Sequence, residues 1–360
     1  MSTLQISLAM AGGVVLAAIV AHSAWTSRRN APKQAEPTAP PASEGAGPQE
    51  PGERHEPAFD GADLAAVGEG ADPTLGGLPN LPLPEKKPGL DPLIDVIAPL
   101  ALEGVASGDA ALAATPTTRR VGSKPFAIEG LNDATGHWET PVAGQRDRAF
   151  QAGVQLANRT GALNDIEFSE FVMKTQGFAD ALNAAPDFPE MRDEVARARE
   201  LDQFASDHDA QLAFVLRARA AAWSPGYVQQ NAARLGFVPG VIPGRMALPA
   251  STGAGLPPVL TLAFDTQAAL AEDPAQSAIR EVQLSLDVAQ VYRQELPFTR
   301  LREAAAALAQ AMDGVVTDQN GQPLREEAMD GIGADLEKLY DTLDGRDLSA
   351  GSVQARRLFG

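Results

Sequence analysis

The chain has 360 residues, of which 47 are acidic and 29 are basic, so its formal net charge at pH 7 is −18. A chain this acidic is repelled by phosphate backbones, and nucleic acid is therefore excluded as an expected partner. The absence of cysteine excludes disulfides, thiolate metal sites and a cysteine nucleophile.

An apolar run predicts a single membrane-spanning helix within residues 1–29. From Leu4 to Trp25 the sequence has no Asp, Glu, Lys or Arg, and a helix of that length rises about 33 Å, enough to cross the hydrocarbon layer. A cleaved secretory signal would have a basic residue before a shorter apolar core, whereas here Arg28 and Arg29 follow the run. Because positive charge stays on the cytoplasmic side, we expect a retained anchor with a short N-terminus outside and the bulk of the chain in the cytoplasm. The residues expected to contact the bilayer are Leu4, Val14, Val20, Trp25, Arg28 and Arg29.

Small residues recur every four positions along this run, at Ala9, Gly13, Ala17 and Ala21. Such spacing lets two membrane helices approach closely and would permit weak self-association through the span. Ala and Gly are also common in membrane spans generally, and that simpler interpretation is favoured.

Between residues 30 and 90 the composition is typical of a linker. Twelve of the chain's 28 prolines lie here, among Ala, Glu and Gly. This composition cannot bury enough apolar surface to offset the entropy lost on ordering, so we expect a disordered tether. As a flexible coil it would reach roughly 40–45 Å on average. The stretch "LPNLPLPEKKPG" could be a proline-type recognition segment, although a continued linker is the simpler interpretation.

From residue 91 onward, alternating and helical patterns predict folded structure. The first part contains predicted strands over 92–102, 121–132 and 148–161, a short helix near 107–114, and helices over 165–185 and 191–211. The second part contains predicted strands over 211–219, 245–250, 257–265 and 279–288, helices over 224–237, 297–314 and 325–343, and a short strand and turn over 315–324. Asn164 or Asp165 could cap one helix, Ser224 with Pro225 starts another, and Gly314 is expected to end a third.

The order strand, helix, strands, helix occurs twice along the chain, which favours two similar units in tandem. We place an α+β unit at 91–204, a second at 205–345, and a C-terminal tail at 346–360. The expected fold class is α+β, with each unit an antiparallel sheet of split β-α-β topology, similar to that of RNP domains.

No arrangement of residues predicts catalysis. The histidines His22, His55, His137 and His208 lack metal-ligand spacing, and the chain contains no GxxxxGK[ST] or GxSxG motif. The stretch "GFVPGVIPG" has prolines where a phosphate loop needs backbone donors. We therefore expect no cofactor, no metal and no enzymatic activity, but a protein that binds and tethers.

The layout of span, Pro-rich linker and C-terminal α+β domain resembles that of the ZipA family of bacterial division proteins. The stretch "LAFVLRARAAAWSPGYVQQNAARLGFVPG" is similar to the family's first strand and helix, which close on a Gly-Phe pair, here Gly236 and Phe237. "PVLTLAF" and "EVQLSLDV" resemble its later strands, and "MDGVVTDQNGQPL" is the most specific match. The resemblance covers the anchor, the linker and about residues 205–345. The unit at 91–204 is not part of the minimal family plan.

The resemblance implies a division protein of the bacterial inner membrane that binds the C-terminal tail of FtsZ, the tubulin-like ring protein, on an exposed sheet face. Period-two alternation assigns the two faces of the second sheet. The residues expected in the core are Leu212, Phe214, Leu216, Leu260, Leu262, Phe264, Val282, Leu284, Leu286 and Val288. The residues expected on the binding face are Ala213, Val215, Met246, Ala263, Asp265, Gln283 and Ser285, with Arg245 an alternative to Met246.

This face is more polar than the family's apolar groove, because it includes Asp265 and Ser285. The tail would then bind weakly, helped by attraction of its basic residues to Asp265 and Asp287, or the face is simply solvated. One rival hypothesis is a membrane-anchored adaptor for a different cytoplasmic protein. A second is an RNA-binding sheet, which the acidic charge and the lack of exposed stacking aromatics argue against. A third is an enzyme, which a buried carboxylate cluster would revive.

Overall fold

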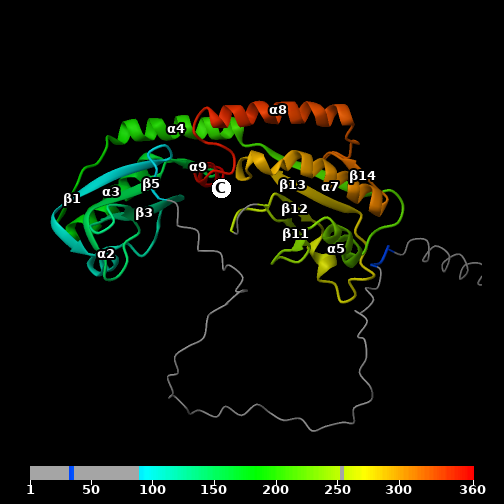
Figure 1. The fold of residues 1–360 in the computed structure, drawn as a ribbon, viewed down its shortest axis with the longest axis horizontal. Coiled ribbons are helices and arrows are strands. Elements are labelled where there is room, and N and C mark those ends of the chain that lie inside the picture. Colours follow the sequence, from blue (N-terminus) through cyan, green and yellow to red (C-terminus); the bar gives the residue numbers. More distant parts are fainter. Residues whose placement is uncertain (1–31, 36–88, 252–254) are drawn as a thin grey trace, which may run out of the picture. The chain divides into compact units, whose positions relative to one another are not determined.

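The computed structural model describes residues 32–35, 89–251 and 255–360 (Figure 1). The expected membrane anchor and most of the expected linker lie outside these residues. Within the described ranges, no helix is both long and apolar enough to cross a bilayer. All described residues belong to one compact body, which contains both of the α+β units expected from the sequence.

The first sheet has the strand order β2-β3-β5-β1-β8, and β4 also pairs with β3. Its strands are β1 (Asp95–Ser107), β2 (Arg120–Val121), β3 (Lys124–Asn132), β4 (Trp138–Glu139), β5 (Arg146–Gln155) and β8 (Ala184–Pro186). The associated helices are α2 (Gly108–Ala114), α3 (Asp165–Leu182) and α4 (Met191–His208), and β6 (Ala157–Asn158) pairs with β7 (Gly161–Ala162). Helix α3 covers the buried face with a row of aromatic rings. Phe178 meets Phe150 of β5 at 5.2 Å between ring centroids.

The second sheet has the order β10-β11-β12-β13-β9-β14. Its strands are β9 (Gln211–Ala218), β10 (Val238–Pro239), β11 (Arg245–Leu248), β12 (Leu260–Ala263), β13 (Glu281–Asp287) and β14 (Gly314–Thr317). Its helices are α5 (Pro225–Arg234), α6 (Thr266–Ala269), α7 (Pro297–Met312), α8 (Glu326–Asp344) and α9 (Val353–Leu358), with 3-10 turns at Val288–Gln290 and Arg293–Glu295. Helix α7 packs on β9, β13 and β14.

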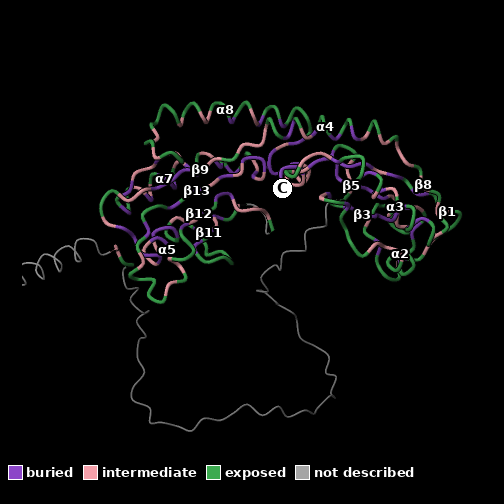
Figure 2. Tube along the Cα trace, turned by 180° about the vertical axis from the view of Figure 1, so that it is seen from behind, coloured by how far each residue is buried: buried purple, intermediate pink, exposed green. Residues whose placement is uncertain are grey.

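The two sheets repeat one connectivity, and every pairing in them is antiparallel. In each, the first strand (β1 or β9) is followed by a helix, by strands that return to pair with it (β5 or β13), by a long helix, and by a last strand on its other side (β8 or β14). The prediction of an α+β fold with antiparallel sheets is therefore confirmed. The buried stretches of the trace follow the strands and the inner sides of the helices (Figure 2).

Local sequence signals explain several helix ends. Asn164 accepts hydrogen bonds from the backbone N–H groups of Ile166 and Glu167, while Glu167 reaches back to the Asn164 backbone, a complete capping box. Ser224 accepts from the Tyr227 N–H, with Pro225 at the first helical position. Helix α7 ends at Met312, two residues before the predicted end at Gly314. Asp313 adopts φ 58° at its C-cap, and Gly314 already belongs to β14.

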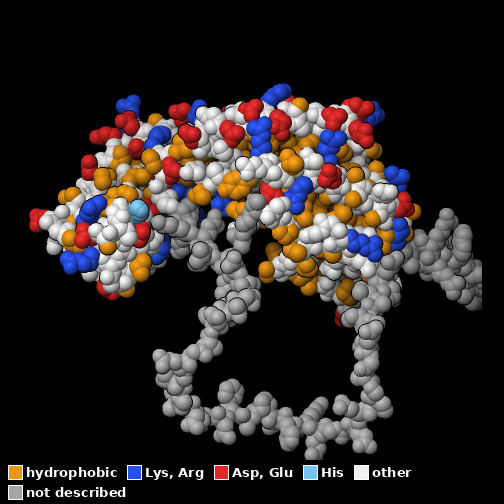
Figure 3. All heavy atoms as spheres, viewed as in Figure 1, with side chains coloured by type: hydrophobic (Ala, Val, Ile, Leu, Met, Phe, Trp, Pro, Cys, Tyr) orange, Lys and Arg blue, Asp and Glu red, His pale blue; other side chains and the backbone are white. Residues whose placement is uncertain are grey.

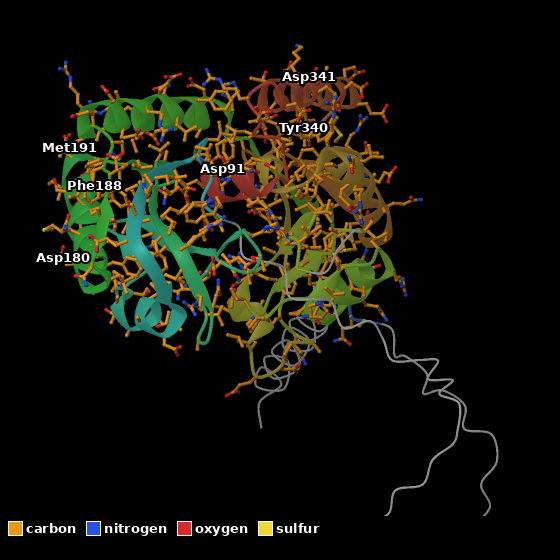
Figure 4. All side chains as sticks on the ribbon, turned by 60° about the vertical axis from the view of Figure 1, so that its left-hand side comes forward. Asp91, Asp180, Phe188, Met191, Tyr340 and Asp341 are labelled. Atoms are coloured by element: carbon orange, nitrogen blue, oxygen red, sulfur yellow. The ribbon has the colours of Figure 1, made fainter. Side chains whose placement is uncertain are left out.

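Helix α8 is attached to the second sheet's unit through Tyr340, which is buried, whereas the adjacent Asp341 points outward (Figure 4). The Arg293 guanidinium lies 5.4 Å from the centroid of the Tyr340 ring and donates to Asp341 at 2.9 Å. Burial raises the pKa of Tyr340 to about 12. The phenol therefore remains neutral across the physiological pH range.

Residues 346–360, expected only as a tail, contain α9 and pack into the core. Leu348, Ala350, Ala355, Leu358 and Phe359 are all buried. The expected division at residue 204 falls inside α4, which continues to His208.

Candidate functional site

The second sheet buries one face and leaves the other accessible along part of its length. On the buried side, Phe214, Leu216, Val282, Leu284 and Leu286 are at most 3% exposed. Nine of the ten predicted core residues are buried, and Leu212 is half-buried. On the opposite side the cross-strand register places Ala213 beside Ser285 and Ser285 beside Thr261.

A groove of about 420 Å³ lies over this opposite face. Its floor includes Ala213 and Ser285, and Pro257 and Pro258 form part of its wall. Four amide side chains line it, namely Gln211, Gln283, Gln290 and Gln319. Each glutamine offers both a donor and an acceptor. The groove is therefore suited to an extended chain that presents backbone N–H and C=O groups.

Two of these amides are already held by neighbours. Gln283 Nε2 donates to Ser285 Oγ at 3.0 Å, and Gln290 Nε2 donates to the Arg356 carbonyl at 3.3 Å. Each still has an acceptor oxygen. The groove thus combines pre-positioned amides with Gln211 and Gln319, which are exposed.

The charge at one end of the groove is neutralised. Asp287 lines the groove, and its Oδ2 lies 2.7 Å from Arg159 Nη2, which also binds Asp209. Burial raises the pKa of the Asp287 carboxyl, and Arg159 opposes that rise. The expected attraction of a basic peptide by Asp287 is therefore weakened by Arg159. Arg245 also lines the groove and is exposed.

Five of the seven predicted face residues lie on this face, and two do not. The register pairs Val215 with Gln283, Gln283 with Ala263, and Ala213 with Ser285. Met246 was the wrong choice between the two alternatives, since it pairs with the core residue Leu262 and is 3% exposed. A one-residue shift in a four-residue strand exchanges the two faces, and Arg245 takes the open position.

Asp265 lies beyond the end of β12, where its side chain accepts from the Gln267 N–H and caps α6. The prediction that it belongs to the sheet face is therefore wrong. Val215 is on the open side but only 8% exposed, and its pairing partner Thr317 is 1% exposed. The accessible part of the face is thus centred on Ala213 and Ser285.

The first sheet's corresponding face is partly covered by the chain itself. Leu90 lies against Gly153 of β5, so closely that a Cβ at position 153 would be 2.4 Å from the Leu90 side chain. The Leu90 N–H donates to Glu129 at 3.1 Å. Part of this face of the first sheet is therefore closed to a partner.

Sequence reasoning missed the groove's outer residues. Gln290 and Gln319 lie outside the strands, where period-two alternation assigns no face. Pro257 and Pro258 fall within the predicted strand 257–265, but β12 begins only at Leu260. Among the described residues, no group of three or more His, Asp or Glu side chains is placed to hold a metal ion. No protein-family model matches the chain, and no curated protein matches it in sequence.

Proposed function

We propose that this protein is a membrane-anchored division protein of the ZipA kind, which holds FtsZ at the inner membrane by binding its C-terminal tail in the groove on the second sheet. The observation that supports this most directly is the groove of about 420 Å³ over an otherwise open sheet face. Concave sites that carry a few well-placed polar groups are where proteins most often bind their ligands.

The connectivity of the second sheet supports the same proposal. Strands β12 and β9 run parallel with β13 between them, since β13 is antiparallel to both. Helix α5 lies between β9 and β12 in the sequence, and β14 pairs with the outer side of β9. Two parallel strands joined through a helix and separated by a third strand are a split β-α-β arrangement. It is the plan that the resemblance to the ZipA C-terminal domain implies. The first sheet repeats it, and its role is proposed to be support of the second.

A binding titration tests the proposal. The full chain, held in detergent micelles, is titrated with a fluorescent peptide of the FtsZ C-terminal tail. In Ala213→Glu, a carboxylate enters the groove floor beside Ser285. We expect roughly tenfold or greater weakening, since the bound peptide would bury that charge. The matched control is Ala113→Glu, which adds the same charge at an exposed position of α2.

Each outcome has a definite meaning. Binding that is lost in Ala213→Glu and kept in Ala113→Glu supports the groove as the FtsZ site. Binding that survives both substitutions would contradict the groove while keeping FtsZ as partner. No binding of either the peptide or whole FtsZ would contradict the proposed function.

The polarity of the groove favours one second candidate, an anchored adaptor for a different cytoplasmic protein. Four glutamines and Ser285 supply little of the apolar area, worth about 25 cal/mol per Å², on which an apolar tail would depend. A partner segment rich in polar side chains would suit these amides. Tight binding of such a segment, with no binding of FtsZ, is the result that would favour this candidate.

A further inference from the structure

Residues 32–35 dock on the unit of the second sheet through backbone pairing. The Lys33 N–H donates to the Ala222 carbonyl at 2.7 Å, and the Lys33 carbonyl accepts from the Ser224 N–H at 2.8 Å. These bonds form a parallel bridge between Lys33 and Trp223, and Trp223 in turn pairs with Ile279. The docked segment thus extends a backbone ladder that already exists.

The Lys33 side chain fixes the segment at the end of α7. Its Nζ donates at 3.1 Å to the carbonyl of Met312, the last residue of that helix. Helix C-terminal carbonyls have partial negative charge and attract cations. The indole N–H of Trp223, which is fully buried, donates to the same carbonyl at 2.8 Å. The segment is therefore attached by two backbone hydrogen bonds and by one hydrogen bond from the charged Lys33 ammonium group.

The docked segment follows the expected anchor closely. Lys33 lies only eight positions after Trp25, so the two residues are at most about 28 Å apart even when the chain is fully extended. The segment 36–88 connects Ala35 to Gly89 and does not lie between the anchor and the second sheet. The long tether expected from the sequence therefore cannot set the distance of the second sheet from the membrane.

Exposed basic side chains surround this docking point. The Arg219 Nε donates to the Gly314 carbonyl at 3.1 Å, and Arg280 Nη1 donates to the Ala220 carbonyl at 3.4 Å. Both arginines are exposed, and neither has an ion-pair partner in the part of the chain that the structure describes. Figure 3 shows Lys and Arg side chains gathered at this end of the unit.

Lys33 and Arg219 both contact Asp313, Lys33 through its side chain and Arg219 through its backbone. Lys33 Nζ is 3.8 Å from Asp313, and the Arg219 N–H donates to the Asp313 carbonyl at 3.2 Å.

We propose that Lys33, Arg219 and Arg280 form a basic patch that docks the second unit directly on the anionic headgroups of the membrane. The proposal rests on the membrane anchor of the proposed function. Lys33 follows Trp25 of the expected anchor by only eight positions, so an anchored chain brings these cations and lipid headgroups together. Each arginine near an anionic leaflet strengthens association about fivefold.

Energy transfer to lipid tests the proposal on the full chain. Because the chain has no cysteine, a donor dye can be placed at one position with Ala220→Cys, an exposed residue inside the patch. The labelled chain is reconstituted in phosphatidylcholine vesicles, with or without phosphatidylglycerol, that contain a headgroup-labelled acceptor lipid. We expect strong transfer that rises with phosphatidylglycerol and falls with salt, since screening weakens headgroup attraction. A dye at Ala113→Cys on α2 is expected to show neither response.

Charge-reversed variants separate the patch from the anchor. The double variant with Arg219→Glu and Arg280→Glu should lower the energy transfer in vesicles that contain phosphatidylglycerol. The transfer should fall to the value measured in phosphatidylcholine vesicles, or below it. The matched control reverses two exposed arginines of α4, Arg192→Glu with Arg199→Glu, and should leave the transfer unchanged. Both pairs change the net charge equally, so only the location differs.

A proline pair tests the docked segment. Lys33→Pro removes both the N–H that bonds to Ala222 and one cation of the patch, and should also lower the transfer, whereas Ala35→Pro removes an N–H outside the bridge, keeps all three cations and should not. Vesicle flotation and FtsZ-peptide binding are measured on the same samples. If the chain floats with the vesicles but the energy transfer does not change with lipid charge or with the two arginine substitutions, this inference alone is overturned. Loss of flotation in the unmodified chain would overturn the anchor and this inference together. Failure of the peptide to bind, with the lipid response intact, would overturn only the FtsZ proposal.

Discussion

Two buried carboxylates of the first sheet differ in whether a partner neutralises them. Asp95 accepts two hydrogen bonds from Arg357, at 2.5 and 2.9 Å, and a third from the Asp91 N–H at 2.8 Å. Asp147 accepts from Gln145 Nε2 at 2.9 Å through one oxygen, and its other oxygen is buried with no hydrogen-bond partner among the described residues. Burial raises the pKa of both carboxyls, and Arg357 opposes the rise at Asp95.

We predict that Asp147→Asn raises the free energy of unfolding at pH 7 by about 1 kcal/mol, because it removes a buried charge that lacks full compensation. The pKa of Asp147 is higher in the folded state than its ordinary 3.8. The folded state therefore favours the protonated Asp147 carboxyl. The contribution of that form to stability is complete below the unfolded pKa and is lost as pH rises through the raised folded pKa. The advantage of Asn should accordingly shrink as pH falls towards 3.8. Urea unfolding of both chains across this pH range measures it.

The control for this prediction is Asp133→Asn, which neutralises an exposed carboxylate nearby in the same sheet's β3–β4 turn. An exposed substitution of this kind should change stability by no more than about 0.5 kcal/mol at any pH. An Asp147→Asn variant that is less stable than the unmodified chain at pH 7 would contradict the assignment of Asp147 as an uncompensated charge.

At the scale of single elements, helix caps are where the sequence determines the structure most locally. We predict that Asn164→Ala lowers stability by about 1 kcal/mol, because the backbone N–H groups of Ile166 and Glu167 lose their acceptor. Ser169→Ala, on the exposed side of the same helix, is the matched control and should have little effect. Urea unfolding compares the two. Equal losses of unfolding free energy in Asn164→Ala and Ser169→Ala would show that the cap contributes nothing beyond helix propensity.

The elements that could be predicted are those with long, regular patterns. Strand β13 alternates perfectly between buried and open positions, and α3 and α5 begin at the capping residues named from the sequence. Strand β8 is only three residues, Ala184–Pro186, and too short to show a period. The same limit explains Met246, because a four-residue strand does not fix its own register.

The long-range contacts could not be predicted for a different reason. Lys33 lies in a Pro-rich stretch and joins the fold through a single bridge to a residue 190 positions away, Trp223. Helix α9 is six residues long, packs on the Val288–Gln290 turn and on β6, and binds β1 through Arg357 and Asp95. Neither has a local pattern that marks a partner. In the candidate groove, likewise, the strand residues were predictable, whereas Gln290 and Gln319 come from connections whose path only the fold defines.

At the scale of the whole chain, the C-terminal helix α9 joins the ends of the folded region. Arg357 binds Asp95 of β1, Gln354 Nε2 donates to Asp91 at 2.8 Å, and Gln155 Nε2 donates to the Arg357 carbonyl at 2.8 Å. Asp91 lies beside α9 in Figure 4. Asp95 is 1% exposed, so the Arg357–Asp95 pair is shielded from solvent and from salt.

We predict that Arg357→Met alone lowers the free energy of unfolding by about 3–5 kcal/mol, because it leaves the Asp95 carboxylate buried without its countercharge. Removing both charges, with Arg357→Met and Asp95→Leu, should restore much of that loss, since well-packed apolar groups often replace a buried ion pair at little cost. The double-mutant cycle, measured by urea unfolding, gives the coupling between the two residues. The exposed pair Arg302 and Asp330, at 2.7 Å, is the matched control, and its cycle should give less than about 1 kcal/mol. Additive losses in the Arg357–Asp95 cycle would mean that each side chain stabilises its own surroundings, and that the pair does not hold α9 on β1.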